Sequence, residues 1–301
     1  MTGGAGTGVL GIDVGGTKIA AGIVDPATGA IRARETIATG AARGGSAVLD
    51  DTIALARRLI GAARLRVDRI GVGVPQLVDN VGRIRSAYNF DWTDLPVRER
   101  LSTLAPTTIE SDVRAAARAE AAFGAGEGRR VFVYVTIGTG VSYCLVIDGR
   151  PHAGANGFAI HFASSALHVP CEACGHVNAP VLEEIASGPA IGAAYARRTG
   201  RSIDAPDLLA AATSGDAAAG DIVSAAARQL GPLVALVVNM LDPEAIVLGG
   251  GLGLAAGPYR EQLIAATRAH IWADSCRDLP ILPAALGVDA GLIGAALAAC
   301  G

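Results

Sequence analysis

The sequence has little of several things that mark particular classes of protein. It has five cysteines in 301 residues, an odd and scattered set that does not suit a disulfide framework. Its formal net charge of −3 gives no electrostatic reason to expect nucleic acid as a partner. No apolar run of membrane length is evident, and the first eight residues lack the basic region and apolar core of a signal peptide. We therefore expect a cytoplasmic protein that binds neither nucleic acid nor membranes.

Apolar residues, in contrast, make up 51% of the chain, and its 301 residues are enough for two domains with buried cores. Helical spacing of apolar residues over 46–62 predicts a helix, and the short apolar run 69–75 predicts a buried strand. A strand–turn–strand follows over 130–150, and a long amphipathic helix over 222–241 leads to another apolar strand. This order predicts an α/β protein.

The most informative stretch is residues 9–25, where an apolar strand enters a Gly-Gly turn and a second apolar strand leaves it. The candidate nucleotide-binding residues in it are Asp13, Gly15, Gly16, Thr17 and Lys18. The glycines can adopt positive φ and expose backbone N–H groups, the aspartate can hold a hydrated Mg²⁺, and the threonine and lysine can face a triphosphate. A Gly-Gly between strands is also a common hairpin turn, but a hairpin needs neither the acid nor the lysine. The glycine spacing of a Walker loop is absent, and no helix follows as in a Rossmann fingerprint.

The run GIDVGGTK resembles the first phosphate motif of the ROK family (repressors, open reading frames and kinases), part of the actin-like ATPase superfamily. Most enzymes of that family phosphorylate hexoses. The resemblance implies an actin-like ATPase (ribonuclease H-like) fold of two α/β domains with an interdomain cleft. We expect an N-terminal domain over 1–114, completed by a C-terminal helix over 288–301, and a C-terminal domain over 115–287. ATP and Mg²⁺ are the expected cofactors, and we expect a homodimer.

The second chemical stretch is residues 107–124, a strand followed by an alanine-rich helix. Its Glu110-Ser111-Asp112 resembles the Glu-Asn-Asp motif of the family. The match implies that Asp112 is the base that takes the proton from the attacking hydroxyl, a role that suits phosphoryl transfer. Ser111 stands where the family has a substrate-contacting asparagine. Either residue is also a suitable helix cap, which is the structural alternative.

Two further glycine turns resemble family motifs. The second phosphate motif is matched by Gly138, Thr139 and Gly140, and the adenosine-binding turn by Gly249, Gly250 and Gly251. A plain β-turn and a simple strand-to-helix connection are the alternative interpretations. The turn 138–140 is the second glycine turn between apolar strands in this chain, which favours phosphate binding over a plain β-turn.

The residues expected to bind the acceptor depart from the family pattern. Asn89 and Glu183 match family residues that contact sugar hydroxyls, although an asparagine in a loop is often only a turn former. Gln76 replaces a glycine, so a side chain is expected where backbone normally suffices. His161 and Ser164 replace the glutamate and histidine that grip hydroxyls near carbons 1 and 2. We weigh a binding role for His161 against a structural one.

The family also carries a structural zinc in this region, and two of its four ligands are lost here. The chain still offers His168, Cys171, Cys174 and His176, which suit tetrahedral Zn²⁺. A rebuilt zinc site and a metal-free loop with reduced thiols both remain open.

These matches predict ATP-dependent transfer of the γ-phosphoryl group to a primary hydroxyl of a sugar or sugar-like polyol. Because the contacts near carbons 1 and 2 are exchanged, a C7-cyclitol or modified hexose is favoured over glucose. An ordinary glucokinase and a catalytically silent sugar-binding regulator are the alternatives. A repressor of the family would need a helix-turn-helix segment before Val9, and eight residues precede it.

Overall fold

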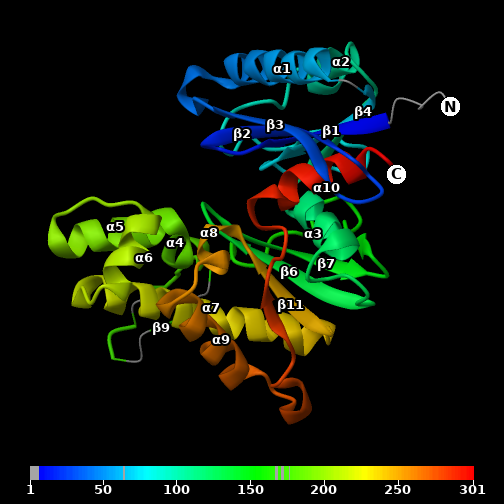
Figure 1. The fold of residues 1–301 in the computed structure, drawn as a ribbon. Helices are drawn as coiled ribbons and strands as arrows, with labels where there is room; N and C mark the ends of the chain where they lie inside the picture. Colours follow the sequence, from blue (N-terminus) through cyan, green and yellow to red (C-terminus); the bar gives the residue numbers. More distant parts are fainter. Residues whose placement is uncertain (1–6, 64, 167–168, 171–172, 176) are drawn as a thin grey trace. The chain divides into compact units, whose positions relative to one another are not determined.

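The computed structural model describes residues 7–63, 65–166, 169–170, 173–175 and 177–301. The chain forms two compact units (Figure 1). The first unit contains Met1–Gly128, Val146–Ile160 and Val288–Gly301, and the second contains Arg129–Leu145 and His161–Gly287. Each unit is therefore assembled from segments that are far apart in the sequence.

The first unit is built on a five-stranded sheet in the order β3-β2-β1-β4-β5. Its strands are β1 (Thr7–Val14), β2 (Lys18–Val24), β3 (Ile31–Ala38), β4 (Arg66–Val74) and β5 (Thr107–Ser111). β2 pairs antiparallel with β1 and β3, whereas β1, β4 and β5 run parallel. Asp13, Gly73 and Glu110 lie in one row across the three parallel strands. The carboxyl ends of these strands therefore share one edge of the sheet, where the candidate acids lie.

The helices of the first unit cover both faces of this sheet (Figure 1). They are α1 (Gly45–Ala62), α2 (Val97–Ser102), α3 (Asp112–Phe123) and α10 (Ala290–Ala298), together with the 3₁₀ helices η1 (Ala41–Arg43) and η3 (Gly287–Asp289). α1 buries apolar residues at helical spacing against one face. α10 packs so closely on the other face that a Cβ at Gly71 would lie 1.7 Å from the carbonyl oxygen of Ala295. A Cβ at Gly294 would lie 1.6 Å from the carbonyl oxygen of Ala115 in α3. Glycine is needed at both contacts.

A second five-stranded sheet has the order β12-β11-β6-β7-β8. Its strands are β6 (Val131–Ile137), β7 (Val141–Ile147), β8 (Arg150–Pro151), β11 (Ala245–Gly249) and β12 (Ile281–Pro283). β11 is fully buried and runs parallel to both β6 and β12. A separate two-stranded ribbon pairs β9 (Val169–Pro170) with β10 (Val177–Asn178). The predicted strand–turn–strand over 130–150 corresponds to β6 and β7. The boundary between the two units falls within β7.

The second unit carries most of the helices. They are α4 (Glu183–Ala186), α5 (Gly188–Thr199), α6 (Ala205–Thr213), α7 (Ala217–Leu241), α8 (Gly250–Leu254), α9 (Pro258–His270) and the 3₁₀ helix η2 (Asp274–Cys276). Among the described helices, α7 is long and apolar enough to cross a membrane, so the prediction that no run has this length is wrong for it. Half of its most apolar window is buried in the structure, where it packs against α9. This burial is typical of a core helix.

The two units differ from the predicted domains in two places. The predicted boundary after Arg114 falls inside α3, whereas the whole of α3 belongs to the first unit because it packs on α10. Residues 146–160 also return to the first unit. The apolar pattern of the sequence predicts individual elements such as α1 and β4 but carries no signal for which unit a segment joins.

Candidate functional site

The turn between β1 and β2 presents exposed side chains on a fixed backbone. The backbone N–H of Gly15 donates to the carbonyl oxygen of Lys18 at 2.9 Å, which closes the turn. Thr39, which is fully buried, donates its hydroxyl to the carbonyl oxygen of Gly15 at 2.7 Å and its N–H to that of Thr17 at 2.9 Å. Thr17 and Lys18 are exposed. Thr39 could not be identified from the sequence, since nothing in the local pattern links it to a turn more than twenty residues earlier.

Two carboxylates occupy the carboxyl edge of the first sheet. Burial raises the pKa of Asp13 to about 6, and the positive charge of Lys18 offsets part of that rise. Burial raises the pKa of Asp112 to about 7, and the negative charge of Asp13 adds to it. Geometry places the two acids at the same edge, since Asp13 lies level with Gly73 and Glu110 across the sheet and Asp112 comes two residues after Glu110. Such a pair is typical of a functional site, because a bound cation or a transferred proton relieves the repulsion.

Asp112 is the first residue of α3. Ser111 is the N-cap residue, but its side chain makes no capping hydrogen bond to the helix. Oδ1 of Asp112 accepts a hydrogen bond from the backbone N–H of Val113 at 2.6 Å. This bond and the positive charge of Arg114 lower the pKa of Asp112 and so oppose the effect of burial. The carboxylate is held at the helix N-terminus, which favours its ionised form.

Asn89 lies beside the Gly-Gly turn. A Cβ at Gly16 would lie 3.0 Å from Oδ1 of Asn89, so the amide faces the turn closely. The loop that carries Asn89 is anchored by Phe90 and Trp92, which are buried with their rings 4.8 Å apart. Gln76 is also buried, and its Nε2 donates to the carbonyl oxygen of Phe90 at 3.1 Å. Gln76 therefore supports the Asn89 loop instead of projecting freely, which corrects the expectation from its sequence position.

Gly291, in the first turn of α10, is a site residue that the sequence analysis did not identify. A Cβ at this position would lie 2.7 Å from Oδ2 of Asp13, closer than real Cβ contacts. The helix N-terminus also favours a nearby negative charge. The C-terminal helix over 288–301 was predicted, but only the fold shows that it begins against an acid more than 270 residues earlier.

In the second unit the two remaining glycine turns lie against each other. The backbone N–H of Gly138 donates to the carbonyl oxygen of Gly140 at 2.9 Å, and the carbonyl of Gly138 accepts from Gly188 at 2.8 Å. Gly250 has a φ of +75°, and a Cβ there would lie 2.4 Å from the carbonyl oxygen of Ile137. The structure thus brings the turns 138–140 and 249–251 together, with space for backbone alone at their contact.

Glu183 lies at the same place. Its Oε2 accepts a hydrogen bond from the backbone N–H of Val141 at 2.8 Å, and a Cβ at Gly140 would lie 2.9 Å from that oxygen. His161 and Ser164, which replace the family's substrate-binding pair, are both exposed, with 3.3 Å between Nδ1 of the ring and Oγ of the serine. The two exchanged residues therefore interact with each other.

The zinc prediction stays a prediction. His168, Cys171 and His176 lie outside the described residues, and Cys174 is exposed. Across the part of the chain that the structure describes, no group of three or more His, Cys, Asp or Glu side chains is arranged to hold a metal ion.

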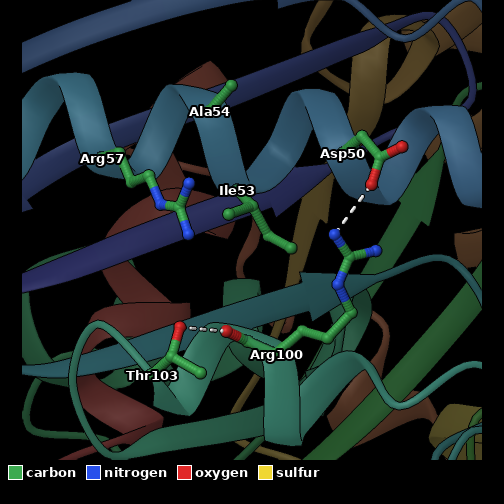
Figure 2. Close-up of a pocket in the computed structure, with 6 residues that line it drawn as sticks. All are labelled: Asp50, Ile53, Ala54, Arg57, Arg100 and Thr103. Atoms are coloured by element: carbon green, nitrogen blue, oxygen red, sulfur yellow. Dashed lines mark hydrogen bonds and ion pairs between the residues drawn. The ribbon is translucent and has the colours of Figure 1, made fainter.

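A separate pocket lies between α1 and α2, with a volume of about 320 Å³ (Figure 2). It is lined by Asp50, Ile53, Ala54, Arg57, Arg100 and Thr103. Arg100 pairs with Asp50 at 2.8 Å, and both side chains are well exposed, as is common for surface charges. None of the residues predicted to bind nucleotide or acceptor lines this pocket.

The chain is similar to known proteins over nearly its whole length. A family model described as "ROK family" matches residues 9–300. The chain is 31% identical to a glucokinase from Halalkalibacterium halodurans, over 95% of this chain and 92% of that protein. It is also 31% identical to an N-acetylmannosamine kinase from Yersinia pseudotuberculosis, over 96% of this chain and 97% of that protein.

Solved structures agree with the sequence matches. A ROK hexokinase from Thermus thermophilus is 34% identical, with a TM-score of 0.79 over 97% of this chain and 98% of that one. A ROK family glucokinase from Streptomyces griseus, in complex with glucose and AMPPNP, is 28% identical, with a TM-score of 0.83 over 97% and 99%. The predicted α/β fold of the actin-like ATPase type is confirmed, and the structure builds it on two five-stranded sheets.

Proposed function

Because the chain belongs to the ROK family, we propose that it is an ATP-dependent kinase that phosphorylates a primary hydroxyl of a sugar or sugar-like polyol. The relatives named as glucokinases and N-acetylmannosamine kinases match nearly the whole chain, which supports this class of reaction. The observation that carries the proposal is the pair of close carboxylates, Asp13 and Asp112, at the sheet edge beside the Gly-Gly turn.

In the proposed mechanism Asp112 accepts the proton of the attacking hydroxyl and orients its oxygen toward the γ-phosphorus. Asp13 would hold a hydrated Mg²⁺, which supplies charge neutralisation for the phosphates when bound. The residues fit such a cation, since two neighbouring carboxylates with raised pKa values repel each other until a positive charge is shared between them. Lys18 and the backbone N–H group of Gly16 would face the phosphates, while the N–H of Gly15 closes the turn that holds them in place.

The second unit is proposed to hold the rest of the nucleotide. The turn Gly138–Thr139–Gly140 would bind phosphate oxygens through the backbone N–H groups of Thr139 and Gly140, because the N–H of Gly138 closes the turn. The turn 249–251 would lie against the adenosine. The absence of side-chain space at Gly250 and the bond from Val141 to Glu183 support a fixed backbone there. A rigid backbone donor is suited to phosphate, because it needs no reorganisation when charge develops.

For the acceptor we propose a ring that carries a primary hydroxyl and differs from glucose near carbons 1 and 2. Asn89, Ser111 and Glu183 would contact the acceptor, and His161 would do so in place of the family's glutamate. The support is that His161 and Ser164 are exposed and interact with each other, so neither family side chain is reproduced. A site that hydrogen-bonds hydroxyls discriminates strongly through such groups. A C7-cyclitol is the first candidate and a modified hexose the second, in a cytoplasmic homodimer.

The test is turnover of the full chain with ATP and Mg²⁺ over glucose, N-acetylmannosamine and a C7-cyclitol. Acceptor-dependent ADP formation that is lost in Asp112→Asn would support the proposal. No acceptor-dependent turnover over a broad panel of sugars and cyclitols would indicate a silent sugar-binding protein. A kcat/KM for glucose that leads by about a hundredfold or more would make this an ordinary glucokinase and overturn the acceptor proposal.

A further inference from the structure

Arg114 places a buried cation two residues after the proposed base. Only 3% of the residue is exposed. Its Nε donates to Oε1 of Glu110 at 2.6 Å, its Nη2 donates to the carbonyl oxygen of Val78 at 3.0 Å, and its Nη1 donates to the carbonyl oxygen of Gly157. A buried guanidinium is costly unless its N–H groups are paired, and here all three nitrogens donate to protein acceptors. One side chain therefore joins the start of α3 to two remote segments.

These two segments also contact each other. Gly157 has a φ of +88°, and a Cβ there would lie 2.4 Å from the carbonyl oxygen of Val78, so their backbones touch. Nδ2 of Asn80 donates to the carbonyl oxygens of Gly154 and Ala155 at 3.1 and 2.8 Å. The turn after β4 and residues 154–160 thus form one layer against α3, and Arg114 is its buried link.

The layer lies next to residues that the proposed reaction uses. Gln76, at the start of the turn after β4, supports the loop of Asn89 through its bond to Phe90. Residues 154–160 lead directly to His161 in the chain. The position of an acceptor that reacts at Asp112 therefore depends on how this layer packs against α3.

We propose that Arg114 is a positioning residue for the acceptor: its guanidinium holds the turn after β4 and residues 154–160 in fixed register with the helix that begins at Asp112. The proposal rests on the proposed function, because that function places the acceptor beside these segments. Arg114 itself does not touch the acceptor, since its nitrogens are used within the protein. The planar fork of arginine serves three acceptors at once, which the single ammonium of lysine does not.

The first experiment measures amide hydrogen exchange of the full chain without ligands in Arg114→Lys. Arg118→Lys is the matched control: it lies one turn later in α3, its side chain is 26% exposed, and its nearest carboxylate oxygen, on Glu110, is 3.9 Å away. We expect exchange in 76–80 and 154–160 to rise about tenfold or more in Arg114→Lys and to stay within about twofold in the control. Unchanged exchange in Arg114→Lys would overturn the proposal.

The second experiment separates positioning from a general structural role. In Arg114→Lys the KM for the acceptor should rise about tenfold while the KM for ATP stays within about twofold. Equal losses for both substrates would assign Arg114 a structural role only and overturn the proposal. If Arg114→Lys does not fold, Asn80→Ala replaces it, because it removes only the exposed bonds to Gly154 and Ala155. Faster exchange at 154–157 is then expected, and unchanged exchange there refutes the link.

Failure of the proposed function gives a different result. Wild-type protein without acceptor-dependent ATP turnover would reject the kinase, while the exchange measurement would still decide whether Arg114 holds the layer.

Discussion

Replacing Asp112 with asparagine should lower activity and raise stability in one variant. The change removes the charge but keeps the size of the side chain. As the proposed base, Asp112 should contribute on the order of a thousandfold or more to turnover, through lost proton transfer and misorientation of the hydroxyl. Nucleotide binding should be retained, since the phosphate turns are untouched. Steady-state kinetics with a saturating acceptor would measure the loss, and activity within about tenfold of wild type would remove Asp112 from the mechanism.

The effect on stability follows from the raised pKa of Asp112. Folding moves this pKa from its ordinary value of 3.8 to about 7, so the folded state binds more protons than the unfolded state between these values. The stability of the wild type should therefore fall as the pH rises through that window. Three pKa units correspond to an upper limit of about 4 kcal/mol at pH 8. Because Asp112 is only partly buried and part of its raised pKa comes from repulsion by Asp13, we expect ionisation of Asp112 to cost about 1–3 kcal/mol of stability at pH 8.

Urea unfolding without nucleotide or Mg²⁺ at pH 5 and pH 8 measures this difference. Asp112→Asn should be more stable than wild type by about 1–3 kcal/mol at pH 8, and by less than half of that gain at pH 5. The control is Asp221→Asn, whose side chain is 65% exposed in a surface ion pair, and it should change stability little. A variant that is less stable than wild type at pH 8 would show that the folded state favours the charged carboxylate, and the reasoning from burial would be wrong.

Three other predictions follow from single contacts. Gly291→Ala should lower kcat about tenfold or more because its Cβ would displace the carboxylate of Asp13. The control is Gly61→Ala, whose Cβ meets no described atom within 4 Å and which should leave kcat unchanged. Equal kcat values for the two variants would refute the contact. Asp13→Asn removes a charge that raises the pKa of Asp112, so the acid limb of the residual kcat/KM profile should move to lower pH, and a shift to higher pH would contradict the pairing. If the cysteine loop binds zinc, elemental analysis should find near-stoichiometric Zn that Cys174→Ser releases; folded, active protein without zinc would decide for the metal-free loop.

Much of the first unit was predictable from the sequence because its signals are local. An apolar run, a Gly-Gly turn and a second apolar run predicted the hairpin of β1 and β2 together with the position of Asp13 at a strand end. The strand before Asp112 and the helix after it were predictable in the same way. Each of these features depends on neighbours within a few residues.

The parts that could not be predicted depend on contacts between distant residues. Thr39 and Gly291 reach the turn and the acid only through strand pairing and helix packing. Gln76 was expected to project, but the fold buries it against the carbonyl of Phe90. Arg114 reads as a solvent-facing residue in an alanine-rich helix, and only the arrangement of the two segments beside it explains why a cation is buried there.

The close packing of α10 has a consequence for biosynthesis. The ribosome makes this helix after all segments of the second unit, yet the groove beside Gly71 belongs to the first unit, whose sheet is synthesised before the second unit begins. A chain that is still being translated therefore carries an unfinished first unit, while the segments of the second unit have all been made. Gly291 belongs to the same helix, so the surroundings of Asp13 are completed only once this helix has been made and has packed on the sheet.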